Sequence, residues 1–402
     1  MRERSVSAVS FREVILFGLI ACLVYGTGAG IRSNIGILLP ALTGQSQCSY
    51  ADVSFCIGMM QLVFGLTQPA FGLLAARTSN RFVLTLGAGF LLLGFAGMRF
   101  ASSFLALVVS LGILFGIGAG AISFGLVLTS VIHVVGQRHA MVVAGMLNAA
   151  SGMLGFILSP AMVWMLSVGG LPLTMLGLGG LSVLVIPCIF LVTMRDTTSA
   201  VPAAGETQNR ISWRTVTDAF SNQPFRMLML GFSTCGFHMI LIESHLFSQY
   251  LSYGIAAIAA GWAFSFYGVS TILGALLSGY LSSRISKGRL LAFYYGFRAV
   301  WVLIYLWVLP KTVITAFLFS IGLGFTGDAT VSPTSGIVGE HFPLAQVATL
   351  VGVLFALHQI GAFLSAYVGG ILVSATQGYE LLWCVDVVLC LGASFASYRI
   401  KK

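Results

Sequence analysis

The stretch GLLAARTSNR, residues 72–81, returns in altered form as GYLSSRISKGR, residues 279–289. Glycine, leucine and arginine hold the first, third and sixth places of both copies, which begin 207 residues apart, at 72 and 279. Each copy is a short basic segment that directly follows a long apolar run. Self-similarity at one fixed offset predicts that the chain consists of two halves with the same internal order.

The composition predicts that most of the chain is surrounded by lipid. Hydrophobic residues make up 58% of the 402 residues and charged residues only 8%, whereas a soluble domain carries roughly 25% charged residues. The 48 glycines agree with this prediction, since glycine is frequent in membrane helices. The net charge of +9 comes from scattered short clusters and forms no basic stripe, so nucleic acid is not an expected partner.

Twelve apolar runs are long enough to cross a bilayer, which takes roughly 20 residues of helix. We therefore predict an all-α membrane protein with twelve transmembrane helices in two six-helix pseudo-symmetric bundles. The first run follows a basic N-terminus but is longer than the apolar part of a signal peptide, so it is predicted to be a retained helix. The predicted spans are residues 13–41, 51–76, 82–100, 103–134, 141–167, 171–194, 225–250, 254–283, 288–309, 312–338, 346–374 and 378–398.

The basic residues predict which way the chain is oriented. With the N-terminus inside, 16 of the 20 lysines and arginines lie in cytoplasmic segments, and only Arg99 and Lys311 lie in outer ones. This bias follows the positive-inside rule and predicts that both termini are cytoplasmic. The longest polar stretch, residues 195–224, is predicted to be a cytoplasmic linker between an N-terminal bundle, 1–194, and a C-terminal bundle, 225–402.

The two repeated loops resemble the G-x-L-x-D-R-x-G-R-R signature of the major facilitator superfamily, with Ala76 and Ser283 in place of the usual aspartate. The resemblance implies a secondary transporter that works by alternating access. It also implies that the loops assist the conformational change, with a latch that differs from the family's aspartate. The loop residues concerned are Gly72, Arg77, Arg81, Gly279 and Arg284.

Four further stretches resemble the bacterial monocarboxylate-porter-like branch of that superfamily: residues 31–40, 235–246, 330–335 and 358–361. This resemblance implies a monomer in a bacterial inner membrane, with a small organic anion as substrate and protons as the coupling ion. The drug/proton antiporters carry an arginine four residues before a Gly-x-Gly run in the fourth helix. Gly112 occupies that place here, which weakens a drug-efflux function.

Arg32 is the first candidate for the solute site, because a charge at the bilayer centre costs about 2.5–3.5 kcal/mol and needs a partner or a function. The resembled fold implies that the first, second, fourth and fifth helices of each half face a central cavity. Tyr25, seven residues before Arg32, shares its helix face, and Asn34 is adjacent. The planar guanidinium suits a carboxylate. The alternatives are an ion pair with another helix or an arginine that extends to the membrane surface.

His238 and His245 lie in the seventh span, seven residues apart on one face. The repeat offset carries Arg32 to a position adjacent to His238, so the two are predicted to face each other across the cavity. A histidine changes charge near physiological pH and can carry a proton or bind an anion. The alternative is a neutral histidine bonded to a backbone carbonyl.

Three acidic residues in the spans have competing interpretations. Glu243 is predicted as the coupling carboxylate, as a partner of Arg32 or as a wetted residue. Asp328 is predicted to face the cavity and couple protons, or to pair structurally with Arg298. Asp386, in the last span, is the other predicted partner of Arg298.

His358 and Gln359 are neighbours in the eleventh span, so only one of them is predicted to face the cavity. Asn148 lies with Ser151, Gly152 and Gly155 on one stripe of the fifth span, which indicates either solute contact or close helix packing.

No other chemistry is indicated by the sequence. It lacks a phosphate-binding G-x-x-x-x-G-K-[ST] loop, a metal-ligand spacing and a nucleophile motif, so we predict no cofactor, no metal and no enzymatic activity. The seven cysteines are predicted to be small apolar fillers. The expected function is proton-coupled transport of a small organic anion, and the alternative is proton-coupled efflux of drugs or metabolites.

Overall fold

The structure is a computed structural model that describes residues 10–195 and 213–400. These residues form helices joined by short loops. The first half consists of α1 (Phe11–Ser33), η1 (Ile35–Leu38), α2 (Leu39–Ser46), α3 (Tyr50–Arg77), α4 (Asn80–Phe100), α5 (Phe104–Leu107), η2 (Val108–Phe115), α6 (Gly116–Ala121), α7 (Phe124–Val135), η3 (Gln137–His139) and α8 (Ala140–Val192).

The second half repeats this order. It consists of α9 (Trp213–Ser221), α10 (Gln223–Leu241), η4 (Ile242–Leu246), α11 (Phe247–Ser252), α12 (Ala257–Ser282), α13 (Lys287–Trp307), α14 (Val313–Thr326), η5 (Asp328–Thr330), α15 (Val331–His341), α16 (Leu344–Thr376) and α17 (Glu380–Tyr398). Most of the predicted linker, residues 196–212, lies outside the described residues, as do residues 1–9 and 401–402.

The twelve predicted spans are confirmed. Within the described part of the chain, 11 helical segments are long and apolar enough to cross a membrane, and one of them, residues 137–192, is long enough for two spans. Its helix α8 is interrupted at Gly170, where φ is +62°. A residue with a side chain rarely adopts that conformation, so glycine permits the chain to reverse there between two spans.

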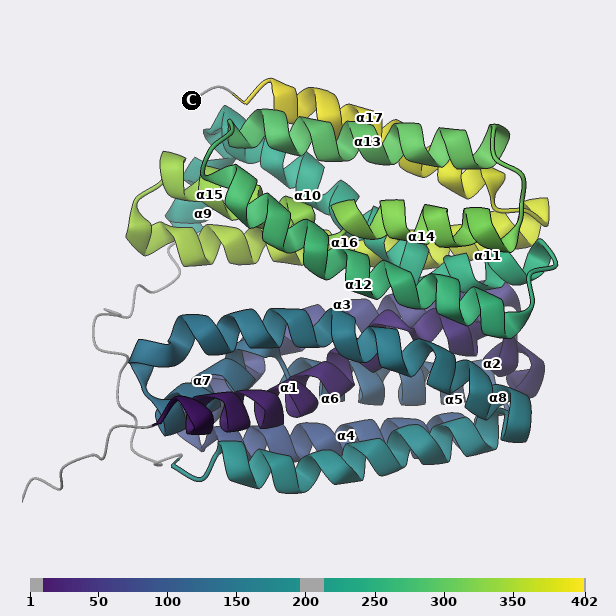
Figure 1. Cartoon of the computed structure of the whole chain (residues 1–402), viewed down its shortest axis with the longest axis horizontal. Helices are drawn as coiled ribbons and strands as arrows, with labels where there is room; N and C mark the ends of the chain where they lie inside the picture. Colours follow the sequence, from purple (N-terminus) through teal and green to yellow (C-terminus); the bar gives the residue numbers. More distant parts are fainter. Residues whose placement is uncertain (1–9, 196–212, 401–402) are drawn as a thin grey trace, which may run out of the picture.

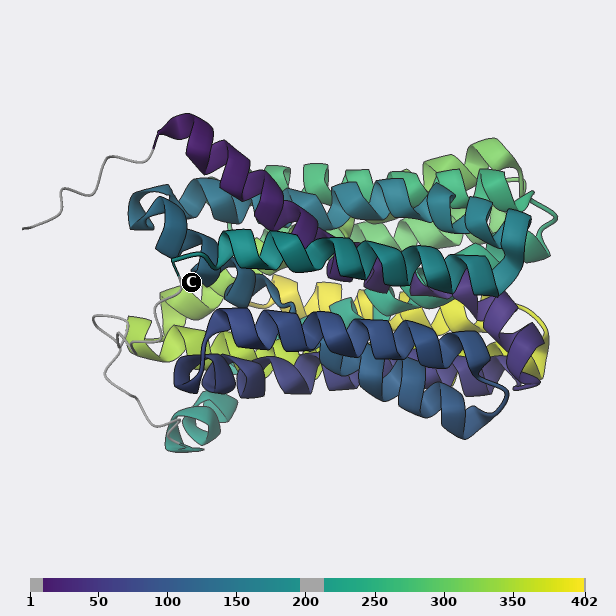
Figure 2. The same cartoon turned by 90° about the horizontal axis from the view of Figure 1, so that it is seen from below.

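The helices form two bundles that lie side by side (Figure 1), with α1–α8 in one and α9–α17 in the other. The start of α1 and the end of α17 lie at the same end of the long axis in both views (Figures 1 and 2), as an even number of spans requires. We call the opposite end, which carries the loops of residues 47–49, 253–256 and 377–379, the distal end.

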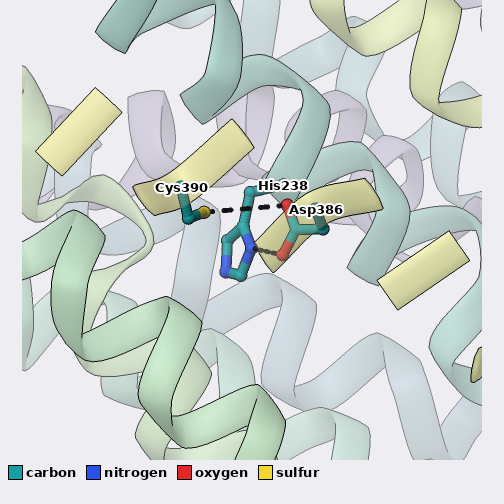
Figure 3. Close-up of side chains that lie close together, drawn as sticks. All are labelled: His238, Asp386 and Cys390. Atoms are coloured by element: carbon teal, nitrogen blue, oxygen red, sulfur yellow. Dashed lines mark hydrogen bonds and ion pairs between the residues drawn. The ribbon is translucent and has the colours of Figure 1, made fainter. Parts of the chain in front are cut away.

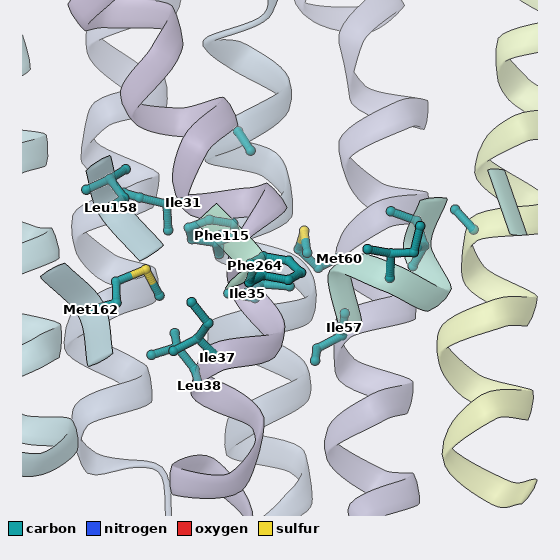
Figure 4. Packing of buried hydrophobic residues seen from close by; sticks show 14 of the residues in the cluster. Ile31, Ile35, Ile37, Leu38, Ile57, Met60, Phe115, Leu158, Met162 and Phe264 are labelled. Carbon is teal, nitrogen blue, oxygen red and sulfur yellow. The ribbon is translucent and has the colours of Figure 1, made fainter. Parts of the chain in front are cut away.

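The core of the first bundle is assembled around the end of α1 and the η1 turn. Figure 4 shows Ile31 and Ile35 between side chains of neighbouring helices, among them Leu158 of α8 and Ile57 of α3. Phe264 of α12 packs into the same cluster from the second bundle. In lipid, this close packing rather than exclusion of water holds helices together.

Glycines allow the two bundles to approach each other where α8 meets α12. A Cβ added at Gly152 of α8 would lie 2.4 Å from the carbonyl oxygen of Gly268 of α12, and one at Gly268 would lie 2.9 Å from that of Gly152. Within the first bundle, a Cβ added at Gly30 of α1 would lie 3.0 Å from the amide nitrogen of Gly155 of α8. The glycines of the small-residue stripe in α8 therefore serve helix packing, which was the second of the two predicted interpretations.

Irregular turns interrupt four spans that the sequence predicted as continuous. The first span changes from α-helix to a 3-10 turn at Asn34, the seventh contains the wide π turn η4, and the tenth is broken at Gly327 before η5. The fourth contains the π turn η2 and is broken between α6 and α7. Non-helical backbone at membrane depth occurs where it is enclosed by protein or lines a cavity. Of the ionisable residues of the predicted site, Arg32, Glu243, His245 and Asp328 lie at or beside these turns, whereas His238 and His358 lie in regular helix.

The contact at Gly152 yields a stability prediction. Gly152→Ala should lower the free energy of unfolding by about 1–3 kcal/mol, because the new methyl group overpacks the interface with α12. Gly145→Ala is the matched control in the same helix, since nothing lies within 4 Å of an added Cβ there. The measurement is the thermal midpoint of the purified protein, and equal midpoints for both variants would contradict the prediction.

Candidate functional site

A continuous chain of polar contacts joins four spans of both bundles near the middle of the molecule. Arg32 donates through Nη1 to Gln61 Oε1 at 2.9 Å and to Glu243 Oε2 at 3.3 Å, and Gln61 Nε2 lies 3.4 Å from the same Glu243 oxygen. Gln359 Nε2 donates to the backbone carbonyl of Gln61 at 2.9 Å. Its Oε1 lies 3.0 Å from His358 Nδ1. The first, second, seventh and eleventh spans therefore meet at this chain of polar contacts.

Arg32 is placed by the way the first helix ends. It lies in the last turn of α1, where a positive charge interacts favourably with the helix dipole. Its guanidinium carbon lies 4.9 Å from the centre of the Phe64 ring, and its side chain remains 18% exposed. Within the described residues, both of its hydrogen bonds use Nη1. Binding of a solute by this guanidinium stays a prediction.

Glu243 reaches Arg32 because the backbones of the two bundles touch. It lies in η4 and is only 3% exposed. A Cβ added at Gly36 would lie 2.3 Å from the Glu243 carbonyl oxygen and 2.5 Å from that of Ser244. Only glycine fits at this point. Of the three predicted roles of Glu243, the structure confirms that of a partner for Arg32.

Asp328 and Tyr25 lie near this polar chain without a direct bond to it. The charges of Arg32, His358 and Arg298 act on Asp328, and those of Arg32 and Asp328 act on Tyr25. Asp328 and Tyr25 are both half-buried, and Tyr25 packs edge-on against Phe124 with ring centres 5.6 Å apart. The grouping of Tyr25 with Arg32 around a solute stays a prediction.

Four of the predicted solute-binding residues lie elsewhere. Asn34 is 2% exposed and donates to the backbone carbonyls of Gly30 at 2.7 Å and Gly155 at 3.1 Å. Its amide thus closes the end of α1 against α8. Asn148 lies exposed on α8, and within the described residues no hydrogen bond joins it to Arg32. The two histidines of the seventh span, described next, bind protein groups.

His245 belongs to a contact at the distal end. Its Nδ1 lies 2.8 Å from the Tyr50 hydroxyl, and its Nε2 lies 3.2 Å from the Ala366 carbonyl oxygen, which matches the alternative of a histidine bonded to backbone. The Tyr379 hydroxyl donates to that of Tyr50 at 3.4 Å. Because Tyr50 is in the first bundle and the other three residues are in the second, this contact joins the two bundles.

His238 does not face Arg32, contrary to the prediction from the repeat offset. It is fully buried, and its Nδ1 lies 2.8 Å from Asp386 Oδ2, while Cys390 Sγ donates to the other carboxylate oxygen at 3.8 Å (Figure 3). These three potential metal ligands lie within 4.8 Å of one another. Since the imidazole and the carboxylate bond each other directly, the group ties α10 to α17 as a hydrogen-bonded network.

Arg298 does not form the predicted ion pair with Asp328 or Asp386. Within the described residues, its Nη2 donates to the carbonyl oxygens of Thr326 and of Gly327, the latter at 2.9 Å, and its Nε donates to Thr326 Oγ1 at 3.3 Å. The prediction failed because Asp386 pairs with His238, and because the break in the tenth span offers the arginine carbonyl groups instead.

The repeated loops lie at the end of the molecule opposite the distal one. Arg81 donates to the Thr193 carbonyl at 2.8 Å, which joins the third span to the end of the sixth. Arg284 lies 4.5 Å from the centre of the Tyr280 ring. Arg77, Gly72 and Gly279 are exposed there. Their part in a conformational change stays a prediction.

Sequence reasoning missed Gln61 and Tyr50, both in α3. Gln61 is fully buried in a predicted span and bonds both Arg32 and Glu243. An uncharged amide inside an apolar run was the available signal, since polar side chains in membrane helices usually bond across helices. Tyr50 lies at the start of its span, where aromatic residues are common, so its position alone did not mark it as a contact residue.

Twelve spans in two repeated bundles, with a charged network where the bundles meet, define a multi-pass membrane transporter. A family model of the Major Facilitator Superfamily matches residues 19–366 and 246–401, so the chain belongs to this superfamily. It is 23% identical over 388 residues to the uncharacterized MFS-type transporter YcxA of Bacillus subtilis (strain 168), covering 92% of this chain and 91% of YcxA. It is 21% identical over 369 residues to monocarboxylate transporter 13 of Rattus norvegicus, covering 91% and 83%.

Solved structures show the same fold at low sequence identity. A bacterial homologue of the human lysosomal transporter Spinster, in an inward-facing and occupied conformation, matches with a TM-score of 0.78 and 15% identity over 97% of both chains. A D-xylose-proton symporter matches with a TM-score of 0.72 and 12% identity over 98% of both chains. These relatives are transporters and not enzymes.

The Arg32–Glu243 pair predicts unequal effects of removing its two members. Removing one partner of a buried pair costs about 3–5 kcal/mol when the remaining charge stays buried. Arg32→Gln leaves the more deeply buried Glu243 and should lower the thermal midpoint more than Glu243→Gln, which leaves the partly exposed Arg32.

The double variant Arg32→Gln/Glu243→Gln should lose less stability than the two single losses combined, by about 0.5–3 kcal/mol. The thermal midpoints of the four proteins measure this coupling. Strict additivity would mean that the contact contributes nothing.

Proposed function

We propose that the protein is a secondary active transporter that carries a small organic anion, a carboxylate, together with protons by alternating access. The observation that supports this best is Arg32, a partly exposed guanidinium that lies where the two bundles meet and is bonded to Glu243 of the opposite bundle. An arginine fork matches a carboxylate in shape and charge. The similarity to a monocarboxylate transporter agrees with this substrate class.

The charges around Arg32 support coupling to protons. Arg32 contributes one positive charge, whereas Glu243 and Asp328 contribute two negative charges when ionised. A bound carboxylate would add a third negative charge. Each uncompensated charge at the bilayer centre costs about 2.5–3.5 kcal/mol on the most lenient scale. An anion therefore binds favourably when Glu243 or Asp328 takes up a proton, so that anion and proton enter the site together.

Glu243 also provides a physical route for the coupling. Its carboxylate occupies the place on Arg32 that a substrate carboxylate would take. When the substrate replaces it, Glu243 loses its cation and becomes an uncompensated buried charge unless it is protonated. We assign Tyr25, His358 and Gln359 to the surroundings of the substrate. His238, enclosed with Asp386, is left out of this path.

The proposed orientation places the distal end outside a bacterial inner membrane and both termini in the cytoplasm. Among the described residues, hydrogen bonds between the bundles lie from the middle of the molecule to the distal end, as at Gln61–Gln359, Ser159–Gly261 and Tyr50–His245. The structure is then closed toward the outside. Opening that side requires these contacts and the Arg32–Glu243 pair to separate.

Arg32→Gln should abolish carboxylate uptake, and Arg32→Lys should raise KM by about 10- to 100-fold, because a point charge replaces a two-pronged donor. The measurement is uptake of labelled pyruvate, lactate and longer monocarboxylates into proteoliposomes with an acidic exterior. Arg99→Gln is the control, since Arg99 is half-buried at the other end of its span and donates to the backbone carbonyl of Pro172, outside the site. Full transport by Arg32→Gln would overturn the proposal.

Glu243→Gln should remove the dependence of uptake on a pH gradient while exchange of labelled for unlabelled carboxylate continues, since the amide mimics the protonated acid. Asp328→Asn tests the second acid in the same way. Glu380→Gln serves as the control, because Glu380 is exposed at the start of α17. A gradient dependence that survives in the Glu243→Gln/Asp328→Asn double variant would exclude both acids as coupling groups.

Efflux of drugs or metabolites is the competing function, and it is favoured by the aromatic rings near the site, Phe64 beneath Arg32 and Phe355 beside His358. The same vesicles distinguish the two functions. Efflux predicts proton-driven movement of amphipathic cations or neutral compounds that does not require Arg32.

A further inference from the structure

The tenth span is broken at membrane depth, and the break immediately precedes Asp328. Helix α14 ends at Thr326, Gly327 follows, and residues 328–330 form a single 3-10 turn before α15 begins. Pro333 lacks an amide hydrogen and cannot bond the carbonyl group four residues earlier, that of Ala329. The break therefore leaves carbonyl oxygens without partners in their own helix.

Side chains of other spans supply the missing donors. Ser278 Oγ of α12 donates to the Ala329 carbonyl at 2.5 Å. Arg298 of α13 donates to the carbonyls of Thr326 and Gly327, and Cys235 Sγ of α10 donates to the Gly327 carbonyl at 3.8 Å. An unsatisfied carbonyl group costs several kcal/mol inside a bilayer, so these donors make the broken geometry stable.

Arg298 is the central donor of this group. It is 0% exposed and donates to three oxygen atoms at the break. Its contacts are to the C-terminal carbonyls of α14, where the helix dipole offers partial negative charge to a cation. The hydrogen bonds of Arg298 thereby fix the direction in which the next residue, Asp328, leaves the helix.

We propose that Arg298 is a positioning residue for the transport site: by holding the break in the tenth span, it sets the position of Asp328, one of the two proposed coupling acids. Asp328 is half-buried and is the first residue of the 3-10 turn that follows the carbonyl groups bonded by Arg298. Arg298 belongs to the ninth span, outside the polar chain described above, and contacts none of its members directly. The link to transport rests on the proposed function, whereas the link to the break does not.

The first test follows the backbone and needs no substrate. Hydrogen–deuterium exchange of the amides of residues 327–332 should become roughly tenfold faster or more in Arg298→Met, because hydrogen bonds to a charged donor are lost at the break. Arg298→Lys, which keeps a charged donor, should restore part of the protection. Thr326→Val is a milder variant for use if Arg298→Met does not fold, because it removes only the Oγ1 atom, which accepts from Arg298 and donates to the Leu323 carbonyl.

Trp301→Phe is the matched control for exchange. Trp301 lies one turn after Arg298 and donates to the Phe319 carbonyl of α14 at 3.2 Å, away from the break. It should leave exchange at residues 327–332 unchanged. Unchanged exchange in Arg298→Met, or acceleration spread equally over all spans, would overturn the proposal.

The second test asks whether Arg298 acts through Asp328. Arg298→Lys should raise KM for proton-driven carboxylate uptake in the wild-type background and cause little further change in the Asp328→Asn background. Independent effects in the two backgrounds would show that Arg298 has only a structural role. If Arg32→Gln retained full transport, the proposed function would fall while the exchange result at the break would still stand.

Discussion

A bilayer core offers no hydrogen-bonding partner, so each carbonyl group and charge placed there must be matched by another group of the protein. The irregular turns of the spans obey this requirement. Asn34 closes the end of α1 with its amide, and Arg298 and Ser278 bond the carbonyls at the break of the tenth span. The same requirement brings Arg32 and Glu243 together from opposite bundles. Site and fold thus follow from one constraint.

The architecture was predictable because lipid imposes a simple rule on sequence. Runs of roughly 20 apolar residues mark spans, and the repeated loops at 72–81 and 279–289 mark the two halves. The turns at Asn34 and Gly327 were not predictable in this way, because a broken and an unbroken helix have the same apolar length. Only Gly324, Gly327 and Pro333 indicated the break at Gly327.

The sequence predicted which residues belong to the site better than it predicted which residues bond each other. Arg32, Glu243 and Gln359 lie in one network because lipid offers no hydrogen-bonding partner, so charged and amide groups in the spans bond other protein groups. His238 was misplaced because the repeat offset gives the depth of a residue and not its rotation about the helix. Arg298 was misassigned because a count of charges suggests ion pairs, whereas its partners are backbone carbonyls, which no sequence pattern reveals.

The buried polar groups separate into two kinds according to which bundles they join. The pairs Arg32–Glu243 and Tyr50–His245 cross from one bundle to the other, whereas His238–Asp386 and the Arg298 contacts remain within the second bundle. A transporter that opens alternately to each side must break contacts of the first kind and keep those of the second. In the proposed function, a substrate that replaced Glu243 on Arg32 would lower the cost of separating the bundles, because the arginine would then keep a partner on its own side. Binding and movement would thus be linked through one guanidinium.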